Sequence, residues 1–217
     1  MGKPYRLVVF DWEGTLGDIL GQILNSVSTE AKRLQFGELD EQLARQSVGL
    51  GLVLALKKSF PHLNEEQQEQ LLLAVHQSLV SRTTEVYLIP GAREIAERLQ
   101  HAGIDIGIAT NKGHQSLQRV LQASGLDQLF KVTRSAGQTP AKPCPQMLEE
   151  IMDTYGVNAK ETLMVGDSVS DIEMAKSIAV DAIGVDFYHQ QEAALLNAGA
   201  LAVFDDYQQL AKYLQLD

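Results

Sequence analysis

The sequence predicts an α/β protein, namely a doubly wound parallel sheet with an inserted helical domain. Apolar runs of strand length, without polar alternation, recur along the second half of the chain and alternate with amphipathic segments, as in βαβ units. A similar run, LVVF at residues 7–10, stands near the start, and a long stretch with only helical periodicity separates it from the others. We therefore predict a core domain of residues 1–16 and 85–217 and an inserted helical domain of residues 17–84.

The helical stretch follows the first strand directly and continues to about residue 82. Its apolar residues recur at the three- and four-residue spacing of a buried helix face, which predicts about four helices. Asn64 and Gln67 have the spacing of a capping box and predict a helix start. Pro90-Gly91 then marks a turn before a helix that begins at residue 92.

Strands and helices alternate from there to the end of the chain. The expected strands are residues 104–109, 130–133, 162–166, 182–185 and 201–204. Gly125 and Gly156 stand where two of the intervening helices should end, as C-terminal caps commonly do. This order predicts right-handed crossovers and a parallel sheet, in which the carboxyl ends of the strands meet at one edge.

Composition restricts the class of protein and its partners. The chain has 217 residues, a formal net charge of −10 and a pI near 4.9, which argues against nucleic-acid or anionic-membrane partners. We find neither a secretory signal pattern nor an apolar run of the ~20 residues that span a bilayer. The single cysteine, Cys144, excludes a disulfide framework. These features predict a soluble cytoplasmic protein.

Four of the predicted strands are followed by groups that can carry chemistry. These groups are Asp11 with Glu13, Thr110 with Asn111, Lys142, and Asp167 with Asp171. Carboxylates at one sheet edge can hold a hard divalent cation, and one can act as nucleophile while another moves protons. A hydroxyl, a backbone amide and an ammonium can bind an oxyanion. The set suits phosphoryl transfer.

Each of these groups also has a purely structural interpretation. Asp11 could cap the next helix, and Thr110-Asn111 could be a plain helix start. Lys142 could be a solvated loop charge, and Ser168-x-x-Asp171 fits a helix capping box. The coincidence of such groups after four different strands favours a functional site over four unrelated structural roles.

At these positions the sequence resembles the haloacid dehalogenase superfamily of phosphatases. The residues that carry the resemblance are Asp11-Trp12-Glu13-Gly14-Thr15-Leu16, Thr110-Asn111-Lys112, Lys142-Pro143-Cys144-Pro145 and Gly166-Asp167-Ser168-Val169-Ser170-Asp171. They are similar to the four motifs of the superfamily, in the same order. The helical insert resembles the cap of the phosphoglycolate phosphatase and β-phosphoglucomutase branch, and residues 45–52 resemble its specificity segment.

The resemblance implies a role for each matching residue. Asp11 would be the nucleophile that becomes an aspartyl-phosphate, and its other oxygen would bind Mg²⁺ together with the backbone carbonyl of Glu13 and the Asp167 carboxylate. Asp171 would orient these ligands. Phosphate would be bound by Thr110, Asn111 and Lys142, and Arg45 of the cap would contact the substrate. The cap would close over the site and exclude water. The expected partner is a small phosphorylated metabolite, and the expected state is a monomer.

Glu13 departs from the pattern, because hydrolases of this superfamily usually carry aspartate there as the acid and base. The reference pKa values of Asp and Glu, about 3.9 and 4.3, are nearly equal. A displacement of about 1 Å, however, can cost on the order of 100-fold in rate. We expect metal binding to survive and turnover to be reduced. Alternatives are a catalytically impaired protein that binds metal or a partner, a phosphomutase, and a receiver-type signalling domain.

Overall fold

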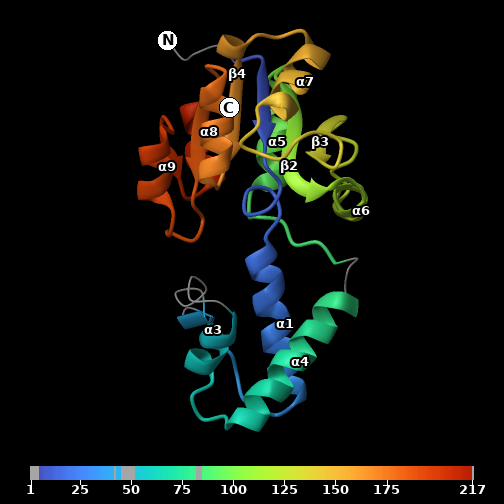
Figure 1. Cartoon of the computed structure of the whole chain (residues 1–217), viewed down its shortest axis with the longest axis vertical. Coiled ribbons are helices and arrows are strands. Elements are labelled where there is room, and N and C mark those ends of the chain that lie inside the picture. The colour runs from blue at the N-terminus through green and yellow to red at the C-terminus, as the bar shows by residue number, and fades with distance from the viewer. Residues whose placement is uncertain (1–4, 42, 45–51, 82–84, 217) are drawn as a thin grey trace. The chain divides into compact units, whose positions relative to one another are not determined.

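The chain divides into two compact units, residues 1–18 with 88–217 and residues 19–87. The computed structural model describes residues 5–41, 43–44, 52–81 and 85–216. In these residues the first unit contains the sheet and its helices, and the second unit contains helices without a paired strand of its own (Figure 1).

The first unit is a parallel sheet, which confirms the predicted fold class. Its described residues form six strands in the order β3-β2-β1-β4-β5-β6. The strands are β1 Leu7–Phe10, β2 Asp105–Gly113, β3 Val132–Ala136, β4 Thr162–Gly166, β5 Asp181–Val185 and β6 Val203–Phe204. The helices are α5 Ala92–His101, α6 His114–Ser124, α7 Gln146–Tyr155, α8 Val169–Ser177, α9 Glu192–Ala198 and α10 Tyr207–Tyr213. β1 is central, and the chain returns from β3 to the other side of β1 to form β4.

The central strand is buried on both faces. Leu7 and Val9 belong to the apolar core that includes residues of α7 and α8. Successive side chains of a strand point to opposite faces, so Val8 and Phe10 belong to the other face, where the Phe10 ring meets Phe130 edge-on at 6.0 Å between centroids. Neither face of β1 is open to solvent. Polar side chains that act on a ligand are therefore expected just after the strand, at its carboxyl end.

Several element boundaries differ from the sequence prediction. β2 was expected to end at residue 109 and instead continues to Gly113, because a bulge lies in its pairing with β3. β3 begins at Val132, two residues later than predicted, because Phe130 packs into the core before the strand starts. β6 is shorter than predicted. The two glycine caps are as predicted: Gly125 and Gly156 follow α6 and α7 with φ of 66° and 63°.

The second unit consists of amphipathic helices. Those described are α1 Ile19–Arg33, α3 Leu52–Ser59 and α4 Glu65–Ser81. The predicted capping box is present at the start of α4: the Gln67 backbone N–H donates to the Asn64 side chain at 2.9 Å, and the Asn64 N–H donates back to Gln67 at 3.0 Å. Val27, Phe60 and Val75 form the core that joins the helices.

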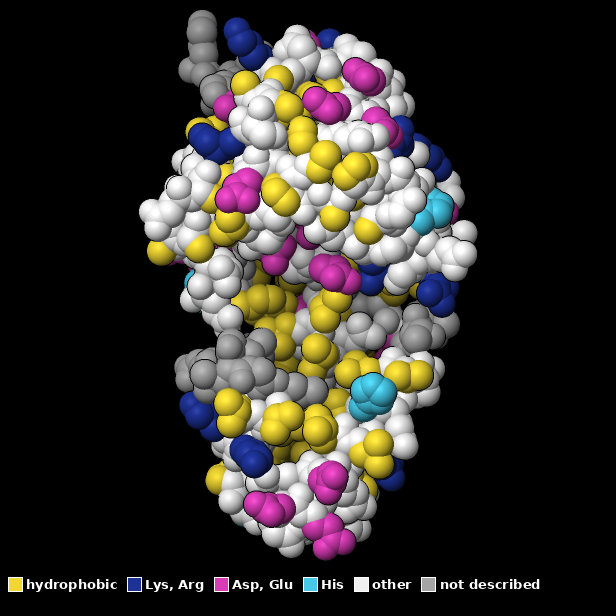
Figure 2. Space-filling view, viewed as in Figure 1, with side chains coloured by type: hydrophobic (Ala, Val, Ile, Leu, Met, Phe, Trp, Pro, Cys, Tyr) yellow, Lys and Arg dark blue, Asp and Glu magenta, His cyan; other side chains and the backbone are white. Residues whose placement is uncertain are grey.

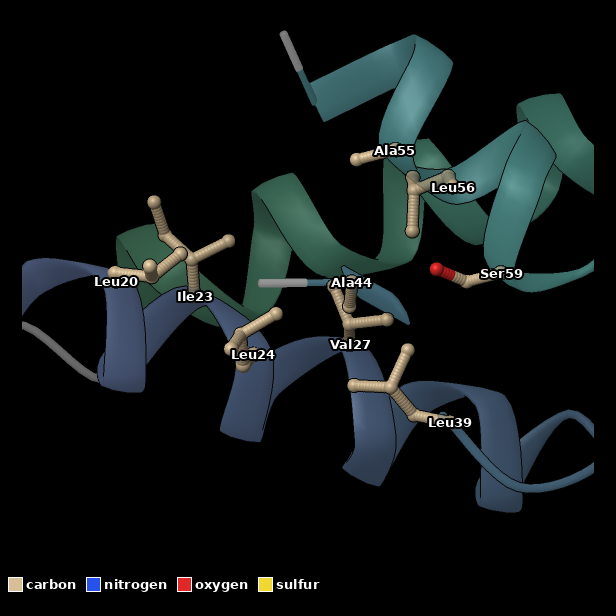
Figure 3. Close-up of a pocket in the computed structure, with 9 residues that line it drawn as sticks. All are labelled: Leu20, Ile23, Leu24, Val27, Leu39, Ala44, Ala55, Leu56 and Ser59. Atoms are coloured by element: carbon tan, nitrogen blue, oxygen red, sulfur yellow. The ribbon is translucent and has the colours of Figure 1, made fainter. Parts of the chain in front are cut away.

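An apolar cavity of about 110 Å³ lies within the second unit. Figure 3 shows that its lining residues come mainly from α1 and α3 and that the Ser59 hydroxyl points among them. The Ser59 oxygen is buried and has no hydrogen-bond partner among the described residues. Apolar side chains also reach the surface of this unit (Figure 2), among them Val53, Leu54 and Val80. The second unit thus contains both an internal apolar cavity and apolar side chains exposed to solvent.

Candidate active site

The central strand ends at a buried carboxylate. Asp11 follows β1 directly, and its backbone N–H donates to Val165 O of β4 at 2.9 Å, so the pairing with β4 continues to this residue. The Asp11 side chain is only 8% exposed. It lies at the carboxyl end of the strand where the order of the sheet reverses, which is the usual ligand position in open α/β sheets.

A tight loop after Asp11 brings a second carboxylate close to it. Gly14 has φ of +75°, and a Cβ there would lie 2.1 Å from Oδ2 of Asp167, which follows β4. Only glycine allows both this conformation and this approach. The Thr15 hydroxyl donates to Asp167 Oδ1 at 3.3 Å, and the Tyr207 hydroxyl donates to Thr15 O at 2.6 Å. The loop is therefore held in place from α10 as well as from β4.

Lys142 links β1, β2 and the start of α8 through one buried ammonium. Its Nζ donates to Asp11 Oδ1 at 2.6 Å, to Asp171 Oδ1 at 2.6 Å and to Ala109 O at 3.3 Å. Its backbone N–H donates to Asn111 Oδ1 at 2.8 Å. The side chain of Lys142 is 3% exposed, so the interpretation as a solvated loop charge is wrong.

Asp171 has the capping role that its spacing predicts and a second role as well. Its Oδ2 accepts from the Ser168 backbone N–H at 3.1 Å and from the Ser168 hydroxyl at 2.7 Å, at the start of α8. Its Oδ1 accepts from Lys142. Both oxygens of this fully buried carboxylate are thus engaged, and Asp171 links the helix start to the ammonium.

The site carries more negative than positive charge. Burial is the main cause that raises the pKa of Asp11 to about 6 and that of Asp167 to about 7, and neighbouring carboxylates raise both further. Burial alone would lower the pKa of Lys142, but the charges of Asp11 and Asp171 outweigh it and raise that pKa above its ordinary value. One ammonium therefore faces three carboxylates.

The same three carboxylates can accommodate a metal ion. Each of Asp11, Asp167 and Asp171 offers an oxygen, and these oxygens lie within 4.8 Å of one another. An all-oxygen set of this kind suits a hard cation such as Mg²⁺. A divalent cation would also offset the excess of negative charge that contributes to the raised pKa values of Asp11 and Asp167. Because Asp171 is engaged on both oxygens, Asp11 and Asp167 are the better direct ligands.

A β-bulge directs two side chains of β2 toward the site. Thr110 pairs with Ser135 and Gly113 with Ala136, so Asn111 and Lys112 are extra residues between successive pairs. Such residues leave the ladder, and their side chains take new directions. The Asn111 side chain accepts from the backbone of Lys142. The buried Thr110 hydroxyl accepts from the Lys112 backbone N–H at 3.2 Å.

The Lys112 ammonium donates to Glu13 Oε1 at 2.8 Å. The Lys112 side chain is 16% exposed and that of Glu13 is 46% exposed. In the sequence, Glu13 follows Asp11 by two residues, and Lys112 follows Thr110 by two residues. It places the Glu13 carboxylate in a defined position at the solvent-facing side of the loop.

Comparison with known proteins identifies the family. The sequence model of the haloacid dehalogenase-like hydrolases matches residues 8–185. The chain belongs to this family. The prediction of a hydrolase of the haloacid dehalogenase superfamily is thereby confirmed, and the match includes nearly all of β1, the whole of β2 and β4, and the residues around Lys142.

The similarity to known relatives extends over nearly the whole length of the chain. It is 28% identical to a phosphoglycolate phosphatase of Rhodospirillum rubrum, in an alignment that covers 96% of this chain and 90% of that protein. It is 31% identical to a phosphoglycolate phosphatase of Mesorhizobium japonicum, with 86% and 84% covered. The similarity therefore includes both units.

Solved structures share the fold. A haloacid dehalogenase family hydrolase from Deinococcus radiodurans, described with bound phosphate and sodium, has a TM-score of 0.71 and 21% identity, with 99% of this chain and 98% of that chain covered. A putative β-phosphoglucomutase from Thermotoga maritima has a TM-score of 0.67 and 23% identity, with 95% and 98% covered. In the part of the chain that the structure describes, no helix has the length and apolarity needed to span a membrane.

The structure brings most of the predicted site residues of this hydrolase together. Asp11, Asp167, Asp171 and Lys142 form one cluster in which all but the half-buried Asp167 are buried, and Thr110 and Asn111 border it on the β2 side. Arg45 and most of its surrounding segment lie outside the described residues.

Three contributions were missed: Thr15, Tyr207 and the Lys112 side chain. Lys112 stood next to the predicted Asn111, but only the bulge shows that it reaches Glu13. Nothing in the sequence pattern signals the contact of Tyr207 with Thr15.

Proposed function

We propose that this hydrolase is a Mg²⁺-dependent phosphatase that acts on a small phosphomonoester, with phosphoglycolate or a sugar phosphate as the substrate class to test first. The main support is the buried cluster itself, in which Lys142 contacts Asp11 at 2.6 Å beside the carboxylate of Asp167. The relatives named phosphoglycolate phosphatase support the choice of substrate class.

In the first half-reaction the Asp11 carboxylate attacks phosphorus, and the bond between phosphorus and the ester oxygen breaks as the aspartyl-phosphate forms. Glu13 gives its proton to the departing oxygen, so the alcohol leaves neutral. Lys142, Thr110 and Asn111 hold the phosphoryl oxygens and offset their charge. Asp11 reacts as the carboxylate, which is favoured above its raised pKa of about 6.

In the second half-reaction water attacks phosphorus while Glu13, now a carboxylate, takes a proton from that water. The bond between phosphorus and Asp11 breaks, and inorganic phosphate leaves. Asp11 and Glu13 return to their starting protonation, so ester and water become alcohol and phosphate without another reactant.

Asp11, Asp167 and the backbone carbonyl of Glu13 would hold the Mg²⁺, with Asp171 and Lys142 orienting Asp11. When bound, the ion would neutralise charge on the transferring phosphoryl group and on the two carboxylates. Asp171 serves the ion indirectly, because its oxygens are engaged with Lys142 and Ser168.

The unit of residues 19–87 is proposed as the cap that selects the leaving group. We further propose that the enzyme acts as a monomer in the cytoplasm and without nucleic-acid or membrane partners. The net charge of −10 and the single cysteine support this choice of compartment and partners.

The test is phosphate release from 4-nitrophenyl phosphate with Mg²⁺, with excess chelator, and by the Asp11→Asn protein. Release that requires both Mg²⁺ and Asp11 supports the phosphatase and leads to a screen of small phosphates that begins with phosphoglycolate. If the wild type releases no more phosphate than Asp11→Asn, the proposal is wrong, and the protein is a metal- or partner-binding member of the family.

A further inference from the structure

Lys112 differs from an ordinary surface partner of a glutamate. Its side chain is 16% exposed, although its ammonium ends at a glutamate that is 46% exposed. Its backbone is held by the buried Thr110 hydroxyl at 3.2 Å. The bulge between Thr110 and Gly113 removes it from the strand ladder and lets it reach the loop after β1. Lys112 is thus the better anchored member of the pair.

We propose that Lys112 is a positioning residue for Glu13: it holds the Glu13 carboxylate where this can take the proton from the attacking water. The inference rests on the proposed function. It explains how a glutamate can work at a position where its extra methylene would otherwise leave the carboxylate free to move.

The need for such an anchor follows from the length of the side chain. Glutamate has one more rotatable bond than aspartate, and ordering a long side chain costs on the order of 1–2 kcal/mol. A misplacement of about 1 Å can cost on the order of 100-fold in rate. An exposed ion pair gains little when both partners must be ordered. Here the Lys112 stem is already ordered by its burial, so the pair orders mainly Glu13.

The ion pair also predicts which half-reaction depends on Lys112. The contact of the Lys112 ammonium with Glu13 Oε1 at 2.8 Å fixes where the Glu13 carboxylate lies. The second half-reaction needs this carboxylate beside the attacking water, whose proton moves to Glu13 as the bond between phosphorus and Asp11 breaks. With an aryl phosphate such as 4-nitrophenyl phosphate, the first half-reaction needs no proton from Glu13, because nitrophenolate leaves without an acid. Loss of Lys112 should therefore slow breakdown of the aspartyl-phosphate selectively.

The experiment measures nitrophenolate release from 4-nitrophenyl phosphate with Mg²⁺, both in the steady state and in the first turnover after rapid mixing. This substrate is chosen because nitrophenolate leaves without an acid. In a two-step scheme, slower breakdown lowers kcat and KM together, leaves kcat/KM unchanged and produces a burst of nitrophenolate. For Lys112→Met we expect kcat and KM to fall on the order of tenfold, with kcat/KM within about twofold of wild type and a larger burst.

Three further proteins complete the design. Lys112→Arg keeps a cation within reach and should restore kcat. Lys131→Met removes an exposed lysine that contacts Gln128 and precedes the amino end of β3, opposite the sheet edge that carries the site, and should match wild type. In a Glu13→Asp background the carboxylate has one rotatable bond fewer to be ordered by an anchor, so Lys112→Met should change kcat by less than about twofold.

The outcomes separate the two proposals. If the wild type shows no Asp11-dependent release, the proposed function and this inference are both wrong. If the wild type is active but Lys112→Met equals it, or lowers kcat/KM as much as kcat without a burst, only the inference is overturned. An equal effect of Lys112→Met in the Glu13→Asp background overturns it too, because Lys112 would then act without Glu13.

Discussion

Replacing Lys142 by methionine should destabilise the sheet unit strongly, because it removes the positive charge between two buried carboxylates. Methionine is chosen because it fills similar space. Lys142 Nζ contacts Asp11 and Asp171, each at 2.6 Å, and its side chain is 3% exposed. Removing one partner of a buried ion pair leaves uncompensated charge and costs about 3–5 kcal/mol. Since whole domains are stable by only about 5–15 kcal/mol, the loss is a large share of the total.

The measurement is urea unfolding followed by the fluorescence of Trp12, the single tryptophan, which is buried in the sheet unit and reports on that unit. Chelator keeps metal out of the site. The loss requires ionised carboxylates, so it should be larger at pH 8 than at pH 5, which lies below the Asp11 pKa of about 6. Lys131→Met serves as the matched surface control.

A second substitution tests the cause of the destabilisation. Adding Asp171→Asn to Lys142→Met removes one of the stranded charges and keeps an acceptor for Ser168, so part of the lost free energy of unfolding should return. A loss below about 1 kcal/mol for Lys142→Met, or an equal loss at pH 5 and pH 8, would refute this account of the cluster.

Three other changes test separate parts of the site. Glu13→Asp should raise steady-state kcat, because geometry rather than the acid's strength limits turnover; an unchanged kcat would contradict this. Mg²⁺ should raise the melting temperature more at pH 8 than at pH 6, because protons compete for Asp167, whose metal-free pKa is about 7; an equal shift would argue against binding there. Gly14→Ala should lower the free energy of unfolding by about 1–3 kcal/mol, because the new Cβ would displace Asp167. It should also abolish the rise in melting temperature with Mg²⁺. If calorimetry shows the variant unchanged in both respects, Gly14 and Asp167 are not in close contact.

The sheet and its helices could be predicted because local patterns agree with the final packing. The bare apolar run of β1 reflects burial on both of its faces, and the glycines after α6 and α7 have the positive φ that their positions require. The boundary of β2 could not be predicted, because its last residues pair with β3 through a bulge that the local sequence does not indicate. Propensity does not record such tertiary pairing.

The site could be predicted as a set of residue types and not as a set of contacts. Parallel strands bring their carboxyl ends to one edge, so Asp11, Lys142 and Asp167 could be grouped before any distance was known. That Asp171 both caps α8 and binds Lys142 could not be predicted, because either role alone explains its position in the sequence. The pairing of Lys112 with Glu13 and that of Tyr207 with Thr15 depend on long-range geometry that no spacing rule contains.

The position of β1 in the middle of the sheet also governs when the site can exist during synthesis. Leu7 is paired on one side with Asp105 and on the other with Thr162, and the helical unit intervenes before the first of these partners is made. The ribosome therefore releases the strand that carries Asp11 first, yet the strand gains its second neighbour only after most of the chain has emerged. Long-range pairing of this kind folds slowly and leaves an apolar strand unprotected in the meantime. Nascent chains that stop short of β4 should accordingly be the ones that chaperones hold.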